Sequence, residues 1–276
     1  MRALSVAVFA LCGLAATACA SQAASGEPVI SAPTPAAAPA SGSDSAPASV
    51  QVKDAAVAPL KGKVVAVDPG HNGGNYKDPK AINKQVDVLT KRKACDTTGT
   101  ATNDGYSEAA FTWDVSQRLA KILKRRGAKV VMTRSNNASV GPCITERAAI
   151  GNKAKADAAI SVHADGAAAG NHGFHVIMPK KINGPVDPVV GASRKLGVAV
   201  RDSFTKTTGQ PYSTYIGSKA LNFRDDLGGL NLSTVPKIFI ECGNMRNAAE
   251  AAKFRDPAFR QKVALGLANG IQTYLK

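Results

Sequence analysis

The sequence predicts an α/β fold, in which a mostly parallel sheet carries helices on both faces. Short apolar runs rich in Val and Ile alternate with segments of helical periodicity throughout residues 59–276. Three of these runs lead into His71, His163 and Glu241. Because ligands bind beyond the carboxyl ends of parallel strands, we expect one functional site at that edge of the sheet.

Two segments precede the predicted domain. Residues 1–19 resemble a secretory signal peptide, since Arg2 is followed by an apolar run that ends in small residues. This run is too short to cross a bilayer. Cys19 follows small residues and resembles a lipoprotein attachment site, so lipid anchoring is the alternative to simple export. Residues 20–58 are rich in Ala, Pro and Ser and are predicted to form a disordered linker.

The charge balance indicates an anionic partner. The chain has 35 Lys and Arg against 20 Asp and Glu, a formal charge of +15. An exported basic domain suits anionic cell-envelope polymers, although a solvated basic face is the simpler alternative. No motif with stacking aromatics or a recognition helix accompanies the lysines, so we expect no nucleic-acid partner. A monomer is the default expectation.

The first predicted strand, residues 64–67, ends at an Asp-Pro-Gly turn that leads to His71. Asp68 lies close enough in sequence to orient the His71 ring. Residues 75–104 then form a basic insertion with a hairpin near 85–90. A loop of this length beside a site is typical of a substrate wall or a lid.

A predicted helix at residues 108–126 begins after Ser107, a good N-cap residue, and ends at Gly127. This places Glu108 in the first turn, at the same sheet edge as His71. Its alternative role is a contact with the helix dipole alone.

The next strand is predicted at residues 128–133. It is followed by a helix at 145–156, in which Glu146 and Arg147 are expected to form an ion pair.

The remaining elements continue the alternation of strands and helices. Strands are predicted at 158–162, 173–178 and 237–240, and helices at 188–208 and 256–275. Residues 221–235 are rich in Gly, Asn and Asp and are predicted to be a loop, with Arg224 either contacting substrate or lying in a surface turn. His172 and His175 are further imidazoles that could serve as ligands.

Three cysteines lie in the predicted domain. Cys95 and Cys143 occur in polar loops, and export permits a disulfide between them. Cys242 adjoins an apolar strand and is expected to be a buried thiol.

His71, Glu108 and His163 together supply two imidazoles and one carboxylate. This set, with a fourth position open to water, is a catalytic zinc arrangement, so we expect one Zn²⁺ per chain. Glu241 is the candidate general acid and base. In the alternative assignment, Glu241 is the ligand and Glu108 only contacts the helix dipole.

Four ordered motifs resemble the zinc-dependent N-acetylmuramoyl-L-alanine amidases of the family 3 type. They are Val-Asp-Pro-Gly-His-Asn-Gly-Gly at 67–74, Ser-Glu at 107–108, Ser-Val-His-Ala-Asp at 161–165, and the 235–244 segment that ends in Glu-Cys-Gly-Asn. The resemblance covers about residues 60–276, and the insertion suggests the actinobacterial branch with a single catalytic domain. One departure is Asn75, where the family has an acidic residue.

The resemblance implies that His71, Glu108 and His163 bind zinc and that Glu241 is the catalytic residue. It also implies a peptidoglycan hydrolase that cleaves the amide between N-acetylmuramic acid and L-alanine during cell-wall remodelling or cell separation. Asp68, Arg224 and Asn244 are further candidates for orienting ligands or substrate.

Two other functions compete with this prediction. A zinc carboxypeptidase-like enzyme would trim stem peptides and would need an arginine, such as Arg224 or Arg134, to bind a terminal carboxylate. A non-catalytic envelope-binding protein would use only the basic surface.

Overall fold

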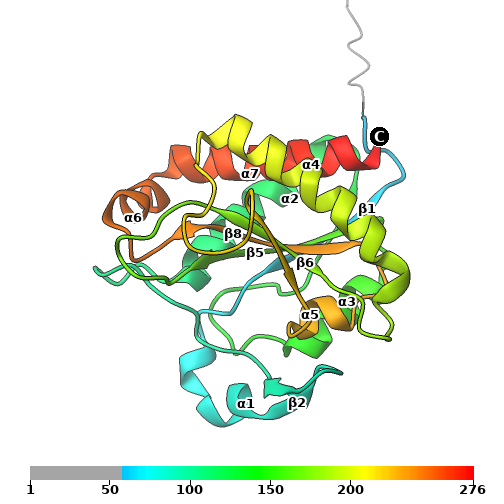
Figure 1. The fold of residues 1–276 in the computed structure, drawn as a ribbon, viewed down its shortest axis with the longest axis horizontal. Coiled ribbons are helices and arrows are strands. Elements are labelled where there is room, and N and C mark those ends of the chain that lie inside the picture. The colour runs from blue at the N-terminus through cyan, green and yellow to red at the C-terminus, as the bar shows by residue number, and fades with distance from the viewer. Residues whose placement is uncertain (1–57) are drawn as a thin grey trace, which may run out of the picture. The chain divides into compact units, whose positions relative to one another are not determined.

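The computed structural model describes residues 58–276, so the predicted signal peptide and all but the last residue of the predicted linker lie outside the described part. A six-stranded sheet forms the centre of the domain (Figure 1). Its order is β4 (Lys129–Met132), β1 (Val64–Pro69), β5 (Ala158–Asp165), β8 (Lys237–Asn244), β6 (His175–Pro179) and β7 (Leu221–Arg224). The strands β4, β1, β5 and β8 are parallel, whereas β6 runs antiparallel to β8 and β7 runs parallel to β6. The predicted mostly parallel sheet is confirmed.

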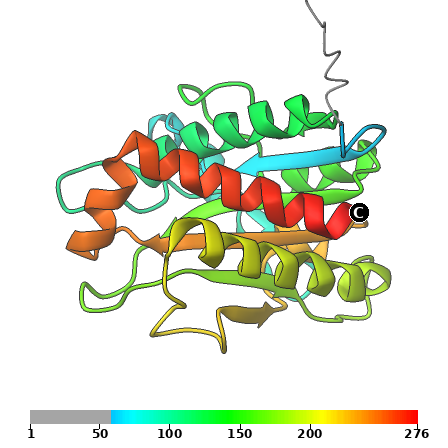
Figure 2. The same cartoon turned by 90° about the horizontal axis from the view of Figure 1, so that it is seen from above.

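Helices cover both faces, as expected. On one face lie α2 (Glu108–Arg125), α4 (Val190–Thr208) and α7 (Pro257–Leu275), with α7 between the other two (Figure 2). The shorter α3 (Ile144–Lys153) and α5 (Gly228–Asn231) lie on the other face. The short 3-10 turn η2 (Asp187–Val189) precedes α4, and α6 (Ala248–Arg255) precedes α7.

The main core lies between the sheet and the three long helices. Alternate strand residues such as Val65, Ile160 and Ile238 point to this face and are fully buried against residues such as Leu119 and Phe204. The opposite face of the same strands carries Asp68, Ser161, His163 and Glu241 at adjoining positions of the strand register. Strand alternation therefore separates the apolar core from the polar site.

The predicted insertion is ordered and contains four short elements: η1 (Asn75–Lys77), α1 (Pro79–Asn83), β2 (Gln85–Asp87) and β3 (Arg92–Ala94). The expected hairpin is confirmed, because β2 and β3 pair antiparallel. The buried Asn231 amide of α5 donates to the Val88 carbonyl (2.8 Å) and to Thr90 Oγ1 (3.3 Å), which ties the hairpin to the domain.

One prediction about the C-terminal half was wrong, and one helix there was missed. Residues 221–235 are not one continuous loop, because β7 pairs with β6 and α5 follows it. The helix α6 was not predicted from the sequence. Both elements of the 221–235 segment are four residues long, too short to establish a periodicity, and they form through pairing with distant residues.

Among residues 58–276, no helix combines the length and the apolar character needed to span a membrane. Cys95 and Cys143 are close neighbours, but both thiols are free, as is the buried thiol of Cys242.

Candidate functional site

His71, Glu108 and His163 converge at the carboxyl edge of the sheet, with one potential ligand atom from each lying within 4.8 Å of the others. His71 Nε2 lies 3.2 Å from Glu108 Oε2, and His163 Nδ1 lies 2.9 Å from Glu108 Oε1. The two imidazole rings are 5.0 Å apart at their centres and nearly perpendicular. Three elements far apart in the sequence thus bring together the predicted metal-ligand set.

Helix capping fixes the position of Glu108. Ser107 Oγ accepts a hydrogen bond from Ala110 N, so the helix starts where the sequence predicted and Glu108 occupies its first turn. The carboxylate accepts hydrogen bonds from the backbone N–H of Thr100 (2.9 Å) and of Ala164 (3.2 Å). Glu108 is therefore held between the insertion and β5, and the helix dipole is not its only contact.

His71 is held in a backbone conformation that is rare outside glycine, with φ of 57°. Its Nδ1 lies 3.1 Å from the Thr97 carbonyl oxygen and 3.5 Å from Asp96 Oδ1, so Nε2 is directed towards Glu108. Burial by itself would lower the pKa of His71, but the Glu108 and Asp96 carboxylates outweigh it and raise the pKa to about 10. The insertion thus supplies the residues that orient this ring.

Two glycines leave room for the three side chains. A Cβ at Gly70 would lie 2.2 Å from the His163 ring, which explains the glycine in the Asp-Pro-Gly-His turn. Gly99 has φ of +76°, and a Cβ there would lie 2.8 Å from Glu108 Oε2 and from the His71 ring.

Asp68 acts on a different histidine from the one predicted. Its carboxylate accepts hydrogen bonds from Ser161 Oγ (3.0 Å), and Ser161 Oγ lies 3.1 Å from His163 Nε2. The expected contact with His71 is absent from the hydrogen bonds of residues 58–276, and Asp96 occupies that role. Asp68 points to the same face of the sheet as Ser161, because it lies within β1 and keeps the alternation of that strand.

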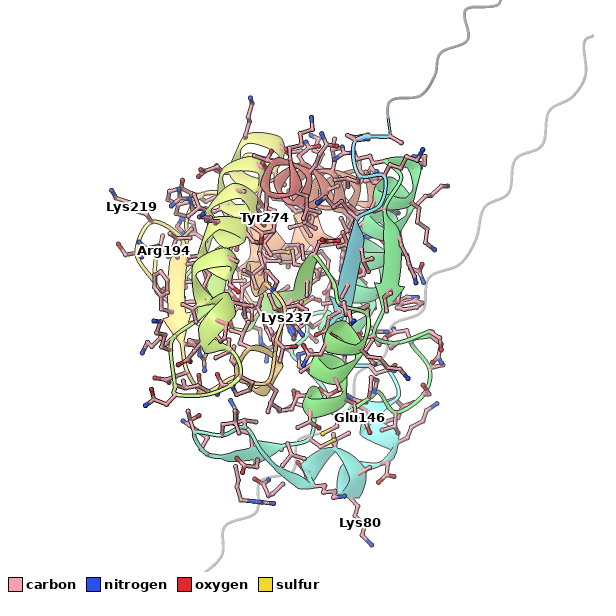
Figure 3. All side chains as sticks on the ribbon, turned by 90° about the vertical axis from the view of Figure 1, so that its right-hand side faces the viewer. Lys80, Glu146, Arg194, Lys219, Lys237 and Tyr274 are labelled. Atoms are coloured by element: carbon pink, nitrogen blue, oxygen red, sulfur yellow. The ribbon has the colours of Figure 1, made fainter. Side chains whose placement is uncertain are left out.

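Buried cations neutralise Asp68. Arg147 Nη1 lies 2.9 Å and Lys237 Nζ 3.1 Å from its oxygens, and all three side chains are almost fully buried. Figure 3 shows Lys237 inside the domain, whereas Lys80 and Lys219 point outwards. Burial favours the neutral carboxyl, but Lys237 and Arg147 outweigh it and hold the pKa of Asp68 well below its usual range.

The predicted ion pair between Glu146 and Arg147 was wrong. Arg147 points inwards to Asp68 and also binds Asp96 at 3.0 Å, whereas Glu146 Oε2 accepts from the Cys143 N–H and caps α3. Adjacent helix residues point in different directions, so the two side chains do not face each other.

Glu241 lies beside the metal-ligand set, opposite His163 in the register of β5 and β8. Its Oε2 is buried without a hydrogen-bond partner among residues 58–276. Burial, with smaller contributions from Glu108 and Asp165, raises the pKa of Glu241 well above its usual range. A partly buried carboxyl that can carry a proton is suited to general acid and base chemistry.

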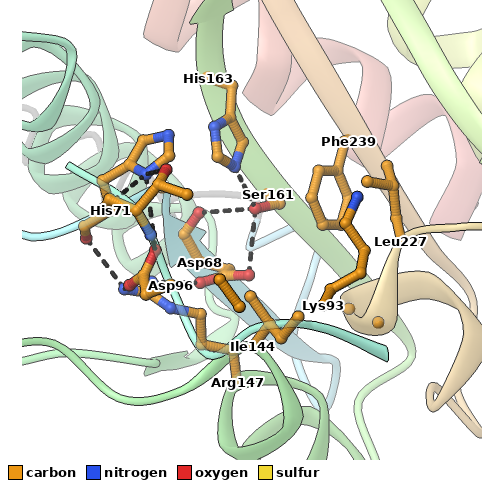
Figure 4. Close-up of a pocket in the computed structure, with 15 residues that line it drawn as sticks. Asp68, His71, Lys93, Asp96, Ile144, Arg147, Ser161, His163, Leu227 and Phe239 are labelled. Carbon is orange, nitrogen blue, oxygen red and sulfur yellow. Dashed lines mark hydrogen bonds and ion pairs between the residues drawn. The ribbon is translucent and has the colours of Figure 1, made fainter. Parts of the chain in front are cut away.

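A small cavity of about 170 Å³ extends from His71 and His163 towards the hairpin (Figure 4). Phe239 stacks on His163 at 5.3 Å between ring centres, and Leu227 and Ile144 complete the apolar wall. The insertion residues Lys93, Ala94, Asp96 and Thr97 contribute to the other walls. The insertion therefore lines the site, in the place expected of a substrate wall or a lid.

Arg224 and Asn244, the other candidates for orienting ligands or substrate, lie in different surroundings. Arg224 lines the open mouth of the site with Glu241, and Asp226 holds its guanidinium through two hydrogen bonds of 2.7 Å. Asn244 is buried and donates to the carbonyls of Ala168 and Asn171, so it supports a loop.

His172 and His175 are not part of the metal-ligand set. His175 is buried opposite Glu241, and burial lowers its pKa to about 4.

Several site residues were missed by sequence reasoning. Ser161 and Phe239 share a strand face with His163 and Glu241, so period-two alternation could have identified them. Asp96, Thr97 and Gly99 reach the site through the path of an irregular loop, for which the sequence carries no periodic signal.

The family model of N-acetylmuramoyl-L-alanine amidases matches residues 65–273, which include every site residue described above. The chain belongs to the N-acetylmuramoyl-L-alanine amidase family. That family is named for hydrolysis of the amide between N-acetylmuramic acid and L-alanine, so the enzyme class expected from the sequence is confirmed.

Mycobacterial members of the amidase family are similar to the chain. It is 38% identical to the N-acetylmuramoyl-L-alanine amidase Rv3717 of Mycobacterium tuberculosis over 218 residues, which cover 78% of this chain and 88% of the relative. The crystal structure of the amidase Ami1 from Mycobacterium smegmatis matches with a TM-score of 0.74 and 39% identity, covering 78% of this chain and 98% of the other. The apo form of Ami1 from Mycobacterium abscessus matches with a TM-score of 0.73 and 42% identity, covering 79% and 100%. The relatives agree with the predicted actinobacterial branch.

Proposed function

We propose that this amidase is zinc-dependent and that His71, Glu108 and His163 bind one Zn²⁺ per chain. It would hydrolyse the amide between the lactyl group of N-acetylmuramic acid and L-alanine of the stem peptide, during cell-wall remodelling or cell separation. The observation that carries this proposal is the convergence of three metal-competent donors within 4.8 Å in a member of this family.

The donor set suits zinc in its chemistry. Two imidazole nitrogens and a carboxylate form the ligand set of many catalytic zinc sites. In each histidine the other ring nitrogen has a partner, Thr97 for His71 and Ser161 for His163, which orients the ring as metal-bound histidines require. When bound, zinc would act as a Lewis acid that polarises the scissile carbonyl and acidifies water.

Glu241 is proposed to move the protons. In its ionised form it would accept a proton from the attacking water, and it would then donate that proton to the departing alanine nitrogen. Its position beside His163 and its unpartnered Oε2 support this role. Asp68 would act indirectly by holding Ser161, and through it the His163 ring.

Arg224 is proposed to bind a carboxylate of the stem peptide. Asp226 holds Nε and Nη2, and the Arg224 side chain faces the same mouth as Glu241. No hydrogen bond of Nη1 occurs within the described domain, so this nitrogen is free to bind an anion. Asn244 is proposed only as a structural support.

Export is proposed from residues 1–19, either with signal cleavage or with lipidation at Cys19, because peptidoglycan lies outside the cytoplasm. In that oxidising environment, we propose that Cys95 and Cys143 form a disulfide. The closeness of the two thiols and the 2.8 Å bond from Ile144 N to the Cys95 carbonyl support this pairing. Thiol titration of the unfolded protein would find one free cysteine in the exported domain, or three if the pair stays reduced.

The activity is tested with muramoyl-L-alanyl-D-isoglutamine. The purified protein should release L-alanyl-D-isoglutamine, should lose activity on chelation and should regain it with zinc. Release of a C-terminal residue instead of the intact dipeptide would favour the carboxypeptidase alternative. Absence of both zinc and cleavage would favour the envelope-binding alternative.

A further inference from the structure

A second groove lies beside the metal-ligand set and has no role in the site described so far. Its volume is about 410 Å³, and its walls include Asn72, Tyr76, Thr98, Thr100 and Arg246. Arg246 Nη1 donates to Asn103 Oδ1 at 3.0 Å, which holds the guanidinium at the groove. The groove therefore combines an aromatic ring, hydroxyl groups and a held cation.

This groove adjoins the mouth of the site. Gly99 and Thr100 line both hollows, and the mouth also contains His71, Glu108, His163 and Glu241. Gly99 has no side chain at this boundary, and a Cβ there would meet Glu108 Oε2 and the His71 ring. A substrate centred on the predicted metal-ligand set can thus extend past Gly99 and Thr100 into the adjoining groove.

Tyr76 is exposed, and the residues on both sides of it are held by hydrogen bonds. Its side chain is 66% exposed, the largest fraction among the exposed large hydrophobic residues of the described domain. Asn75 beside it is fully buried, donates to the Thr97 carbonyl and accepts from Gly141 N, both at 2.8 Å. Lys77 donates to the Ala138 carbonyl at 3.1 Å. A single exposed aromatic is common, but one that is fixed at the rim of a groove leading to a catalytic site is pre-organised for binding.

The substrate of the proposed reaction has two arms, a glycan and a peptide, that leave the scissile amide in different directions. Arg224 lies at the mouth, where a cation suits the carboxylates of the peptide. Tyr76 and the threonines lie in the other hollow. A tyrosine face suits the C–H surface of a pyranose ring, and hydroxyl and guanidinium groups suit its oxygens.

We propose that the Tyr76 groove is a saccharide subsite that binds the glycan arm of the substrate, with Tyr76 stacking on a pyranose ring. This inference rests on the proposed amidase function. It adds that the glycan arm of the substrate binds on the Tyr76 side of the site. Asn75, which replaces the family's acidic residue, serves here as the buried anchor of the Tyr76 turn.

The test compares two substrates that share the same scissile amide. One is the disaccharide peptide N-acetylglucosaminyl-N-acetylmuramoyl-L-alanyl-D-isoglutamine, and the other is D-lactoyl-L-alanyl-D-isoglutamine, which has no sugar. Tyr76→Ala should lower kcat/KM for the disaccharide peptide about five- to tenfold, mainly through KM. Its effect on the lactoyl peptide should be less than twofold, and Tyr76→Phe should retain both activities because it keeps the ring.

Leu265→Ala, an exposed apolar truncation on α7, is the matched control and should change neither activity. Equal loss on both substrates by Tyr76→Ala, or no loss on either, would overturn the subsite. A zinc-loaded wild type that cleaves neither substrate would instead contradict the proposed function, so the two failures are distinguishable.

Discussion

Gly99 lies closer to the metal-ligand set than a residue with a side chain could. In Gly99→Ala the new methyl group would meet Glu108 Oε2 and the His71 ring, so either the loop or the ligands must move. We expect metal affinity to fall about 10- to 100-fold, as measured by competition with a chelator.

Gly105→Ala is the control for backbone strain, because Gly105 also has a positive φ but has no atom near its Cβ position. If both variants lose metal equally, strain and not the collision at Gly99 is responsible.

Asp68 is the centre of a buried ionic cluster. Replacing it in Asp68→Asn leaves Lys237 without its counter-ion and should reduce the free energy of unfolding by about 3–5 kcal/mol. Because the folded-state pKa of Asp68 is lowered, its contribution is present above its unfolded-state pKa, near 4, and is lost as the pH falls further.

Urea denaturation at pH 7 and at lower pH tests this prediction. The difference in free energy of unfolding between wild type and Asp68→Asn should become smaller below about pH 4. Asp202→Asn, at an exposed ion pair, should change stability by less than about 0.5 kcal/mol. If the difference in free energy of unfolding between wild type and Asp68→Asn stays constant with pH, the role of the Asp68 charge is contradicted.

The sequence was most informative about residues in or just after the carboxyl halves of strands and about residues at helix starts. His71, Glu108, His163 and Glu241 could be predicted because each follows a recognisable strand or cap. The partners of Asp68 and Arg147 could not be predicted, because they depend on which side chains meet across the sheet face. Those contacts are tertiary and leave no local pattern in the sequence.

The strands β2 and β3 form a two-stranded sheet of their own, separate from the central sheet, so the hairpin depends on other contacts to stay on the domain. Asn231 connects it to α5 from a fully buried position. Asn231→Ala would leave the Val88 and Asp225 carbonyls without this donor, at a cost of about 1–3 kcal/mol. Hydrogen exchange should then accelerate in residues 85–94 more than in the sheet.

Asn83→Ala, an exposed asparagine at the end of α1, is the control and should leave exchange in the hairpin unchanged. Unaltered protection of residues 85–94 in Asn231→Ala would show that other contacts, such as Lys93 with Asp226, are sufficient.

At the scale of elements, long periodic segments were predicted well and short ones poorly. The helix α2 matches its predicted start because Ser107 caps it. The strands β5 and β8 start where predicted because their apolar runs are uninterrupted, but both continue beyond the predicted ends, to Asp165 and Asn244. The strand β7 has four residues and exists because β6 offers it an edge. Such an element depends on the assembled sheet, so its own residues cannot predict it.

The whole domain is strongly basic. Only two of the 35 Lys and Arg and three of the 20 Asp and Glu precede residue 58, so the described part carries most of the positive charge. We expect binding to anionic cell-wall polymers to weaken steeply between 0.05 and 1 M salt, since screening shortens the range of charge attraction from more than about 10 Å to about 3 Å.

A sedimentation assay with insoluble cell wall and the Glu241→Gln variant measures this binding without digestion. Cleavage of the small lactoyl peptide by the wild type should change far less over the same salt range. Salt-independent sedimentation would show that specific contacts, and not the basic surface, retain the protein on the wall.

In the proposed mechanism, His71, Glu108 and His163 hold the metal, and Glu241 transfers the protons. The most direct test measures the zinc content of Glu241→Gln and its rate of muramoyl-L-alanyl-D-isoglutamine cleavage. We predict one zinc per chain, as in the wild type, and a kcat that is about 10²- to 10⁴-fold lower. Loss of zinc together with activity would make Glu241 a ligand, and full activity would remove it from the mechanism; either result would contradict the account.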